Sequence, residues 1–124
     1  MKTIISRGWS NIREENKKRE EMPMNTQKRH NYKYLKIWKV GIEIVDEVHK
    51  MLNNFPKDEK FGLMSQICRS SASIPSNIAE GPARSDKSFS HIIDISLGFS
   101  FDLETQLIIA NNRNYITNEQ IHKL

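Results

Sequence analysis

Apolar side chains recur at alternating intervals of three and four residues from Tyr32 to the end of the chain, and no other feature limits the fold as much. This spacing gathers them on one side of an α-helix, where they pack against a neighbouring element. It runs through three long segments, at about residues 34–54, 59–80 and 85–111, separated by short connectors. The sequence therefore predicts an all-α protein, an antiparallel up-and-down helix bundle.

The first segment carries its apolar residues in two neighbouring seams. One seam comprises Leu35, Trp38, Ile42, Val45 and Leu52, and the other Ile37, Gly41, Ile44, Val48, Met51 and Phe55. Together they span an arc of roughly 200° around the helix, which is wider than one neighbouring helix covers. We therefore expect two neighbours within the chain, or one neighbour and a second copy of the chain.

The second segment has a waist of small residues at 70–73, where another backbone can approach closely. Asp58 is expected to cap its first turn by accepting a hydrogen bond from a free backbone N–H. Pro75 predicts a kink in this second helix, because proline removes one hydrogen bond and crowds the carbonyl four residues earlier. Gly81 is expected to take a left-handed conformation at the helix end, with Pro82 stopping the helix.

The third helix is expected to begin at Ser85 or Asp86 and to end at residues 112–114, where asparagine tolerates a left-handed backbone. Thr117 then caps a fourth segment, with Gln120 in the capping-box position. This segment reaches only about 10 Å, against about 38 Å for the third helix. The prediction is therefore a four-helix bundle whose fourth helix is truncated.

A truncated fourth helix leaves part of the groove between its neighbours uncovered. We expect a strip of apolar side chains to stay exposed there, together with marginal stability of the chain alone. The strip is expected to include some of Ile37, Ile44, Met51, Ile93 and Leu107.

Charge divides the chain into two parts. Residues 1–31 hold eight Lys and Arg against four Glu, which accounts for the whole net charge of +4. They predict a flexible basic N-terminal tail, in which Met22 or Met24 is an alternative translation start. Residues 32–124 form the predicted helix-bundle domain, whose charges cancel, so this body exerts no strong long-range attraction on phosphate. Binding to RNA or DNA is therefore expected to depend on the tail.

Several features point to the cytoplasm. The one cysteine, Cys68, excludes an internal disulfide and fits a reducing compartment. Residues 1–9 lack the apolar run of a secretory signal. No apolar run approaches the roughly 20 residues that span a membrane. We expect a cytoplasmic protein with no membrane partner.

No pattern of catalytic residues stands out. The four histidines show no ligand spacing with each other, with Cys68 or with a carboxylate pair, so neither a metal nor another cofactor is expected. Arg84 and His91, with six residues between them, match the loose spacing of the all-α HEPN ribonucleases. In that chemistry the pair supports attack of a ribose hydroxyl on the adjacent phosphate. We predict a non-enzymatic protein, with a HEPN-like metal-independent ribonuclease as the alternative.

Several stretches after Tyr32 resemble one protein family. The most distinctive is Ser73-Ile74-Pro75-Ser76-Asn77-Ile78-Ala79-Glu80-Gly81, followed by Arg84. Tyr34–Trp38, Phe55-Pro56, Glu59–Leu63, Leu97-Gly98, Leu103–Leu107 and Tyr115-Ile116 continue the match. These stretches resemble the four-helix-bundle proteins encoded in intervening sequences of bacterial 23S ribosomal RNA genes. The same family includes relatives of the accessory variability determinant of diversity-generating retroelements.

The resemblance implies an antiparallel four-helix protomer that assembles into a homo-oligomeric ring, a pentamer in known relatives. For the retroelement relatives it implies binding to nucleic acid and to a reverse transcriptase. For most members it implies no established activity. We therefore expect a self-associating scaffold, with weak binding to RNA or DNA as a further expectation.

Seven residues form the candidate interaction motif: Pro75, Asn77, Glu80, Gly81, Arg84, Glu104 and Gln106. Asn77 and Glu80 lie three residues apart on one helix face, and we expect them to satisfy backbone groups freed by Pro75 and by the helix end. The alternative is a polar patch at a subunit or ligand contact. Glu104 and Gln106 are expected to form hydrogen bonds at the surface or at an interface.

Overall fold

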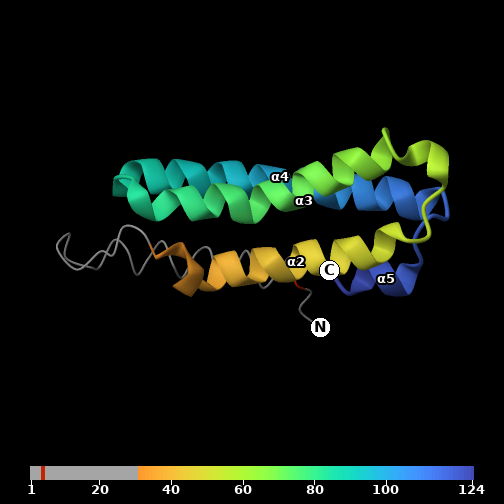
Figure 1. Cartoon of the computed structure of the whole chain (residues 1–124), viewed down its shortest axis with the longest axis horizontal. Coiled ribbons are helices and arrows are strands. Elements are labelled where there is room, and N and C mark those ends of the chain that lie inside the picture. The colour runs from red at the N-terminus through yellow and green to blue at the C-terminus, as the bar shows by residue number, and fades with distance from the viewer. Residues whose placement is uncertain (1–3, 5–30) are drawn as a thin grey trace.

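The computed structural model describes Ile4 and residues 31–124 (Figure 1). Residues 31–124 form four α-helices and no strand, which confirms the all-α prediction. The α-helices are α2 (Lys36–Leu52), α3 (Leu63–Glu80), α4 (Asp86–Asn112) and α5 (Asn118–His122). Three short 3-10 helices lie between or before them: η2 (Tyr32–Tyr34), η3 (Lys57–Glu59) and η4 (Gly81–Ala83).

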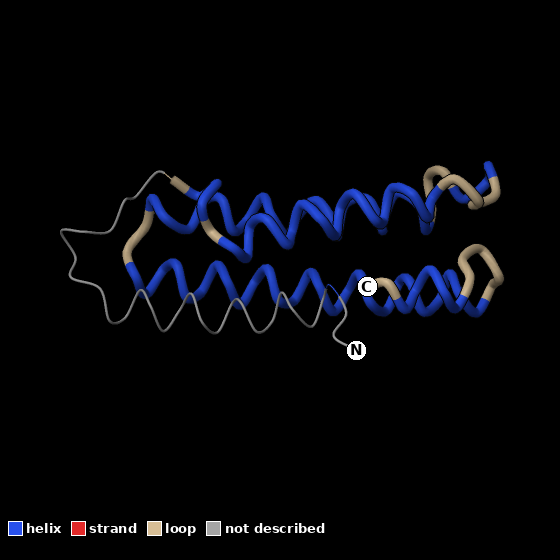
Figure 2. The backbone as a smooth tube through the Cα atoms, turned by 90° about the horizontal axis from the view of Figure 1, so that it is seen from below, coloured by secondary structure: helices blue, strands red, loops and turns tan. Residues whose placement is uncertain are grey.

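The three long helices run side by side, and each is antiparallel to the next (Figures 1 and 2). Helix α3 is central, because it packs against both α2 and α4. Small residues outside the predicted waist at 70–73 allow this close packing. A Cβ added to Gly41 of α2 would lie 3.1 Å from the Pro75 Cβ of α3. On the other side, the Ser96 hydroxyl of α4 donates to the Ile74 carbonyl at 3.3 Å.

One continuous apolar core joins the helices, and the C-terminal segment contributes to it. Ile116 and Leu124 are buried in this core, 3% and 4% exposed. Ile4, the one described residue before Asn31, is half-buried and packs against the same core. The members from the long helices and the first connector are Ile37, Val40, Ile44, Val48, Met51, Leu52, Phe55, Leu63, Ile67, Ile74, Ile78, Phe89, Ile93, Leu103, Leu107 and Ala110.

Local signals at the ends of α4 and α5 are confirmed. Ser85 caps α4, because its hydroxyl accepts a hydrogen bond from the Ser88 N–H. Thr117 and Gln120 form the reciprocal capping box of α5. Asn114 has a φ of 63°, the left-handed conformation expected after α4.

Two predictions for the ends of α3 are wrong. The helix begins at Leu63 with Gly62, not Asp58, at its N-cap position, and the Leu63 N–H is satisfied by the Glu59 carboxylate at 3.0 Å. The reason is that η3 and a turn occupy residues 57–62 before the α-helix starts. Gly81 has φ −59° and ψ −49°, which is right-handed, because the chain continues directly into η4.

The prediction of an exposed apolar strip is also wrong. The five residues named for it, Ile37, Ile44, Met51, Ile93 and Leu107, are each at most 3% exposed. The C-terminal segment folds back along the bundle (Figure 1), and its Ile116 and Leu124 are buried in the core. Ile4 also packs against this core. Cover from outside the three long helices is a long-range feature that helical spacing does not reveal.

The predicted basic tail lies outside the described residues, apart from Ile4 and Asn31. The division into a tail and a bundle domain therefore stays a prediction.

Candidate functional site

The candidate motif begins inside α3, which continues as an α-helix through Pro75. Pro75 has no N–H to donate to the carbonyl four residues earlier. Nearby side chains bond to neighbouring carbonyls. The Asn77 amide donates to the Ser73 carbonyl at 2.7 Å, and the Ser73 hydroxyl donates to the Arg69 carbonyl at 2.7 Å. In this arrangement Asn77 bonds to the backbone of its own helix.

At the α3–α4 turn, Gly81 allows the two helices to pack closely. The Phe89 ring, only 1% exposed, lies against Gly81 so closely that a Cβ added to this glycine would overlap the ring. Pro82 is buried beside it. Glu80 and Arg84 are exposed on either side of the turn. The glycine of the motif is therefore required for a close contact between α3 and α4.

The other two candidate residues lie in the C-terminal half of α4. Ile93 is in the part of α4 nearer to the α3–α4 turn, and Gln106 lies about 20 Å farther along the helix, at 1.5 Å per residue. The buried Oε1 atom of Gln106 accepts no hydrogen bond from the described residues. Glu104 is half-buried. The fold thus brings residues 75–84 together and places Glu104 and Gln106 elsewhere.

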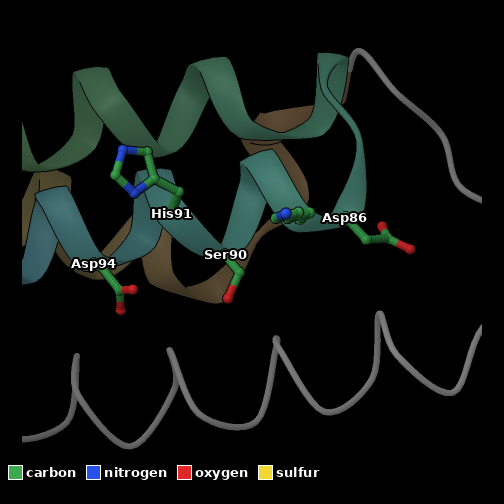
Figure 3. A pocket seen from close by; sticks show the side chains of 5 residues that line it. Asp86, Ser90, His91 and Asp94 are labelled. Carbon is green, nitrogen blue, oxygen red and sulfur yellow. The ribbon is translucent and has the colours of Figure 1, made fainter.

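A shallow depression of about 460 Å³ lies at the start of α4, lined by Asp86, Lys87, Ser90, His91 and Asp94 (Figure 3). Ser90 and Asp94 point to one side of the helix, whereas His91 points to the other. These three side chains therefore do not converge as a nucleophile, base and acid would. Two carboxylates in the lining also disfavour a phosphate beside His91.

The described residues favour neither a metal site nor a reactive thiol. They contain no group of three or more His, Cys, Asp or Glu side chains able to hold a metal ion. Cys68 is half-buried against the core, and burial raises the pKa of its thiol. A raised pKa keeps the thiol protonated and makes it a poor nucleophile at neutral pH.

The distinctive stretch around Pro75 and the long antiparallel helices lie within one region that matches a known family. A model of the 23S rRNA-intervening sequence protein family matches residues 33–124. The chain belongs to this family. No curated protein matches it significantly.

The family match covers α2 to α5 and every candidate motif residue. It begins at Lys33, so the basic segment that precedes it lies outside the family domain. None of the described helices is both long enough and apolar enough to cross a membrane.

One face of α2 is partly exposed to solvent. We call this face the α2 seam, and its residues are Leu35, Trp38, Ile42 and Val45. Ile42 is 36% exposed, and the other three are half-buried. The Trp38 ring meets the Tyr32 ring edge-on at 5.5 Å between centroids. The α2 seam comprises the first four residues of one seam expected from the sequence. The fifth, Leu52, is buried in the core together with the neighbouring seam.

Sequence reasoning missed a polar cluster around Glu59 at the opposite end of the bundle from the α3–α4 turn. One carboxylate oxygen accepts from the Leu63 N–H at 3.0 Å. The other accepts from the Tyr115 hydroxyl at 3.3 Å and lies 3.7 Å from an Arg113 nitrogen. Tyr115 also packs against Phe55, 5.3 Å between ring centroids. Arg113 and Tyr115 lie more than fifty residues from Glu59 in the sequence, so no local spacing signals their part in the cluster.

We predict that Glu59→Ala lowers the free energy of unfolding by about 1–2 kcal/mol, because it leaves the Leu63 N–H and the Tyr115 hydroxyl without this acceptor. Asp58→Ala, one residue away and exposed, is the matched control and should change stability by less than about 0.5 kcal/mol. Urea unfolding measures both. Equal effects of the two substitutions would show that the Glu59 carboxylate does not stabilise the start of α3.

Proposed function

We propose that this chain is a non-catalytic, self-associating helical scaffold, and that copies meet through the α2 seam. The observation that supports the proposal is the partial exposure of Ile42 in the middle of a face formed by four apolar residues. Apolar faces of this kind, rimmed by polar residues, are typical of protein–protein contacts.

The charges around the α2 seam suit contact with another copy. Lys39 and Asp46, seven residues apart on α2, are exposed charges of opposite sign. Residues 32–124 carry no net charge, so two bodies do not repel each other. Contact would remove Ile42 and the exposed part of Trp38 from water. Aromatic residues such as Trp38 are frequent anchors of protein interfaces.

Ile42→Lys should weaken self-association strongly, because a charge at the centre of a contact must lose its water. Phe61→Lys is the matched control, since Phe61 is 90% exposed and lies in the α2–α3 connector, away from the seam. Light scattering would measure the mass of both variants, and circular dichroism their helix content. Equal association of Ile42→Lys and the unmodified chain would exclude the α2 seam as the contact.

Nucleic-acid binding remains a further expectation of this proposal, and it rests on the positive charge of residues 1–31. A reverse-transcriptase partner stays a prediction from the resemblance alone. The ribonuclease alternative has less support, because Asp86 and Asp94 line the depression beside His91.

A further inference from the structure

Two charges of opposite sign lie along one edge of the α2 seam. Lys39 and Asp46 are both exposed, and neither forms an ion pair with another described residue. Because successive residues of an α-helix are 100° apart, these two lie within about 20° of each other around α2. The point midway between them along the helix is next to Ile42, the most exposed residue of the seam.

This spacing fits a second α2 that runs in the opposite direction. When two copies of a helix pack antiparallel about a two-fold axis, the same edge of each helix meets, and residues equally far from the axis on either side face each other. With the axis beside Ile42, Lys39 of each copy faces Asp46 of the other. Two ion pairs then form by symmetry, one on each side of Ile42.

The apolar residues of the α2 seam match in the same register. Ile42 lies at the axis and meets Ile42 of the other copy, whereas Trp38 lies opposite the turn between Val45 and His49 of the other copy. The exposed His49 is held along α2, because its ring bonds to the Val45 carbonyl of its own helix at 3.2 Å. The seam is therefore complementary to itself, as a two-fold contact requires.

The distribution of charge along α2 favours the same direction. Before Ile42 the helix carries two lysines and no acidic residue, whereas after Ile42 it carries three acidic residues and one lysine. That lysine, Lys50, is already 3.2 Å from Glu47 of its own helix. Antiparallel copies place the basic half of each α2 against the acidic half of the other, whereas parallel copies would place like charges together.

Helix α4 of a second copy is a poorer partner for the seam. The other exposed large apolar side chains on the described α-helices lie on α4, at Ile95, Phe101, Ile108 and Ile109. Residues 88–112 of α4 include Asp94, Asp102 and Glu104 but no lysine or arginine. This surface would attract the basic half of α2 and repel its acidic half, whereas a second α2 complements both halves.

We propose that the α2 seam binds the α2 seam of a second copy, antiparallel and about a two-fold axis, with Lys39–Asp46 ion pairs on either side of Ile42. This inference rests on the proposed self-association through the seam, and it adds the partner surface and its direction. A two-fold contact is complete once two chains have met, so a larger assembly requires a further surface.

Charge reversal in the full chain tests the pairing, with sedimentation velocity as the measure of the dissociation constant. Lys39→Glu should raise this constant roughly tenfold, because both ion pairs become repulsive. Adding Asp46→Lys to the same chain should restore it, since the two charges are exchanged and attract again. Lys57→Glu makes the same change of charge at an exposed residue of η3, beyond α2, and should leave the constant unchanged.

The outcomes separate this inference from the proposed function. No effect of Lys39→Glu, or no recovery in the double variant, would overturn the antiparallel pairing. If Ile42→Lys still dissociates the copies in that case, the seam meets a different surface and self-association through it stands. If Ile42→Lys does not dissociate them, both proposals fail.

Thiol cross-linking checks the direction independently. In a Cys68→Ala chain, the Ile42→Cys thiol would face its copy across the axis, whereas the Leu35→Cys thiols would lie about 22 Å apart along the helices. A short bismaleimide should therefore join two chains of the Ile42→Cys variant but not of the Leu35→Cys variant. Equal cross-linking of the two variants would indicate parallel helices and overturn the proposal, as would its absence from Ile42→Cys.

Discussion

Replacing Gly81 by alanine should lower the free energy of unfolding by about 1–3 kcal/mol, the usual effect of forcing extra volume into a packed core. The added Cβ would overlap the Phe89 ring, which is 1% exposed and cannot move into solvent without leaving the core. The backbone of Gly81 is right-handed, so the loss would come from the contact and not from the conformation. Urea unfolding would measure it.

Gly98→Ala provides a control in the same pair of packed helices. Gly98 lies within α4, where an added Cβ would meet no atom within 4 Å. Alanine should therefore raise stability by about 0.5–1 kcal/mol, through its higher helix propensity. If both substitutions change stability in the same direction, the contact with Phe89 is not the reason that glycine is needed at position 81.

Phe89→Ala should have the largest effect, a loss of about 3–5 kcal/mol, because it leaves a cavity at the α3–α4 turn. Total stability of a domain is about 5–15 kcal/mol, so this single change should lower the melting temperature by many degrees. Thermal unfolding followed by circular dichroism would show the shift.

A double-mutant cycle links the two substitutions. In the Phe89→Ala background, Gly81→Ala should be nearly neutral, since the ring that its Cβ would strike is gone. An unchanged penalty for Gly81→Ala in that background would mean that the strain arises elsewhere.

Local sequence signals predicted most of the fold. The spacing of three and four residues identified α2, α3 and α4, because apolar residues at these intervals lie on one side of a helix. Ser85, Thr117 and Asn114 were predicted correctly for a similar reason, since each acts on backbone groups within three or four residues. The family was also recognisable, because the stretch around Pro75 is distinctive.

The wrong predictions depend on how successive elements pack and join, which the spacing within one helix does not determine. Gly81 looked like a left-handed helix end, but Phe89, eight residues later, determines why glycine is needed. Asp58 was chosen by its position, but the helix starts after η3, within reach of Glu59. The exposed strip was inferred from the length of α5, without the cover implied by the buried Leu124 and by Ile4.

The candidate motif shows the same division. Sequence patterns selected Pro75, Asn77 and Gly81 as residues of interest, and the structure places them in and beside one turn. Spacing in the sequence did not reveal that Gln106 lies far along α4, with a buried oxygen that accepts no hydrogen bond from the described residues. Nor did it reveal Glu59, whose partners Arg113 and Tyr115 are brought near only by the antiparallel packing of the bundle.

The mass of the unmodified chain in solution, measured by sedimentation velocity over a dilution series, tests self-association most directly. A single chain has a mass of 14.5 kDa. The proposed scaffold predicts a species of several chains that dissociates on dilution, or on Ile42→Lys, while helix content is kept. A single species of 14.5 kDa at every concentration, for the unmodified chain and Ile42→Lys alike, would contradict it.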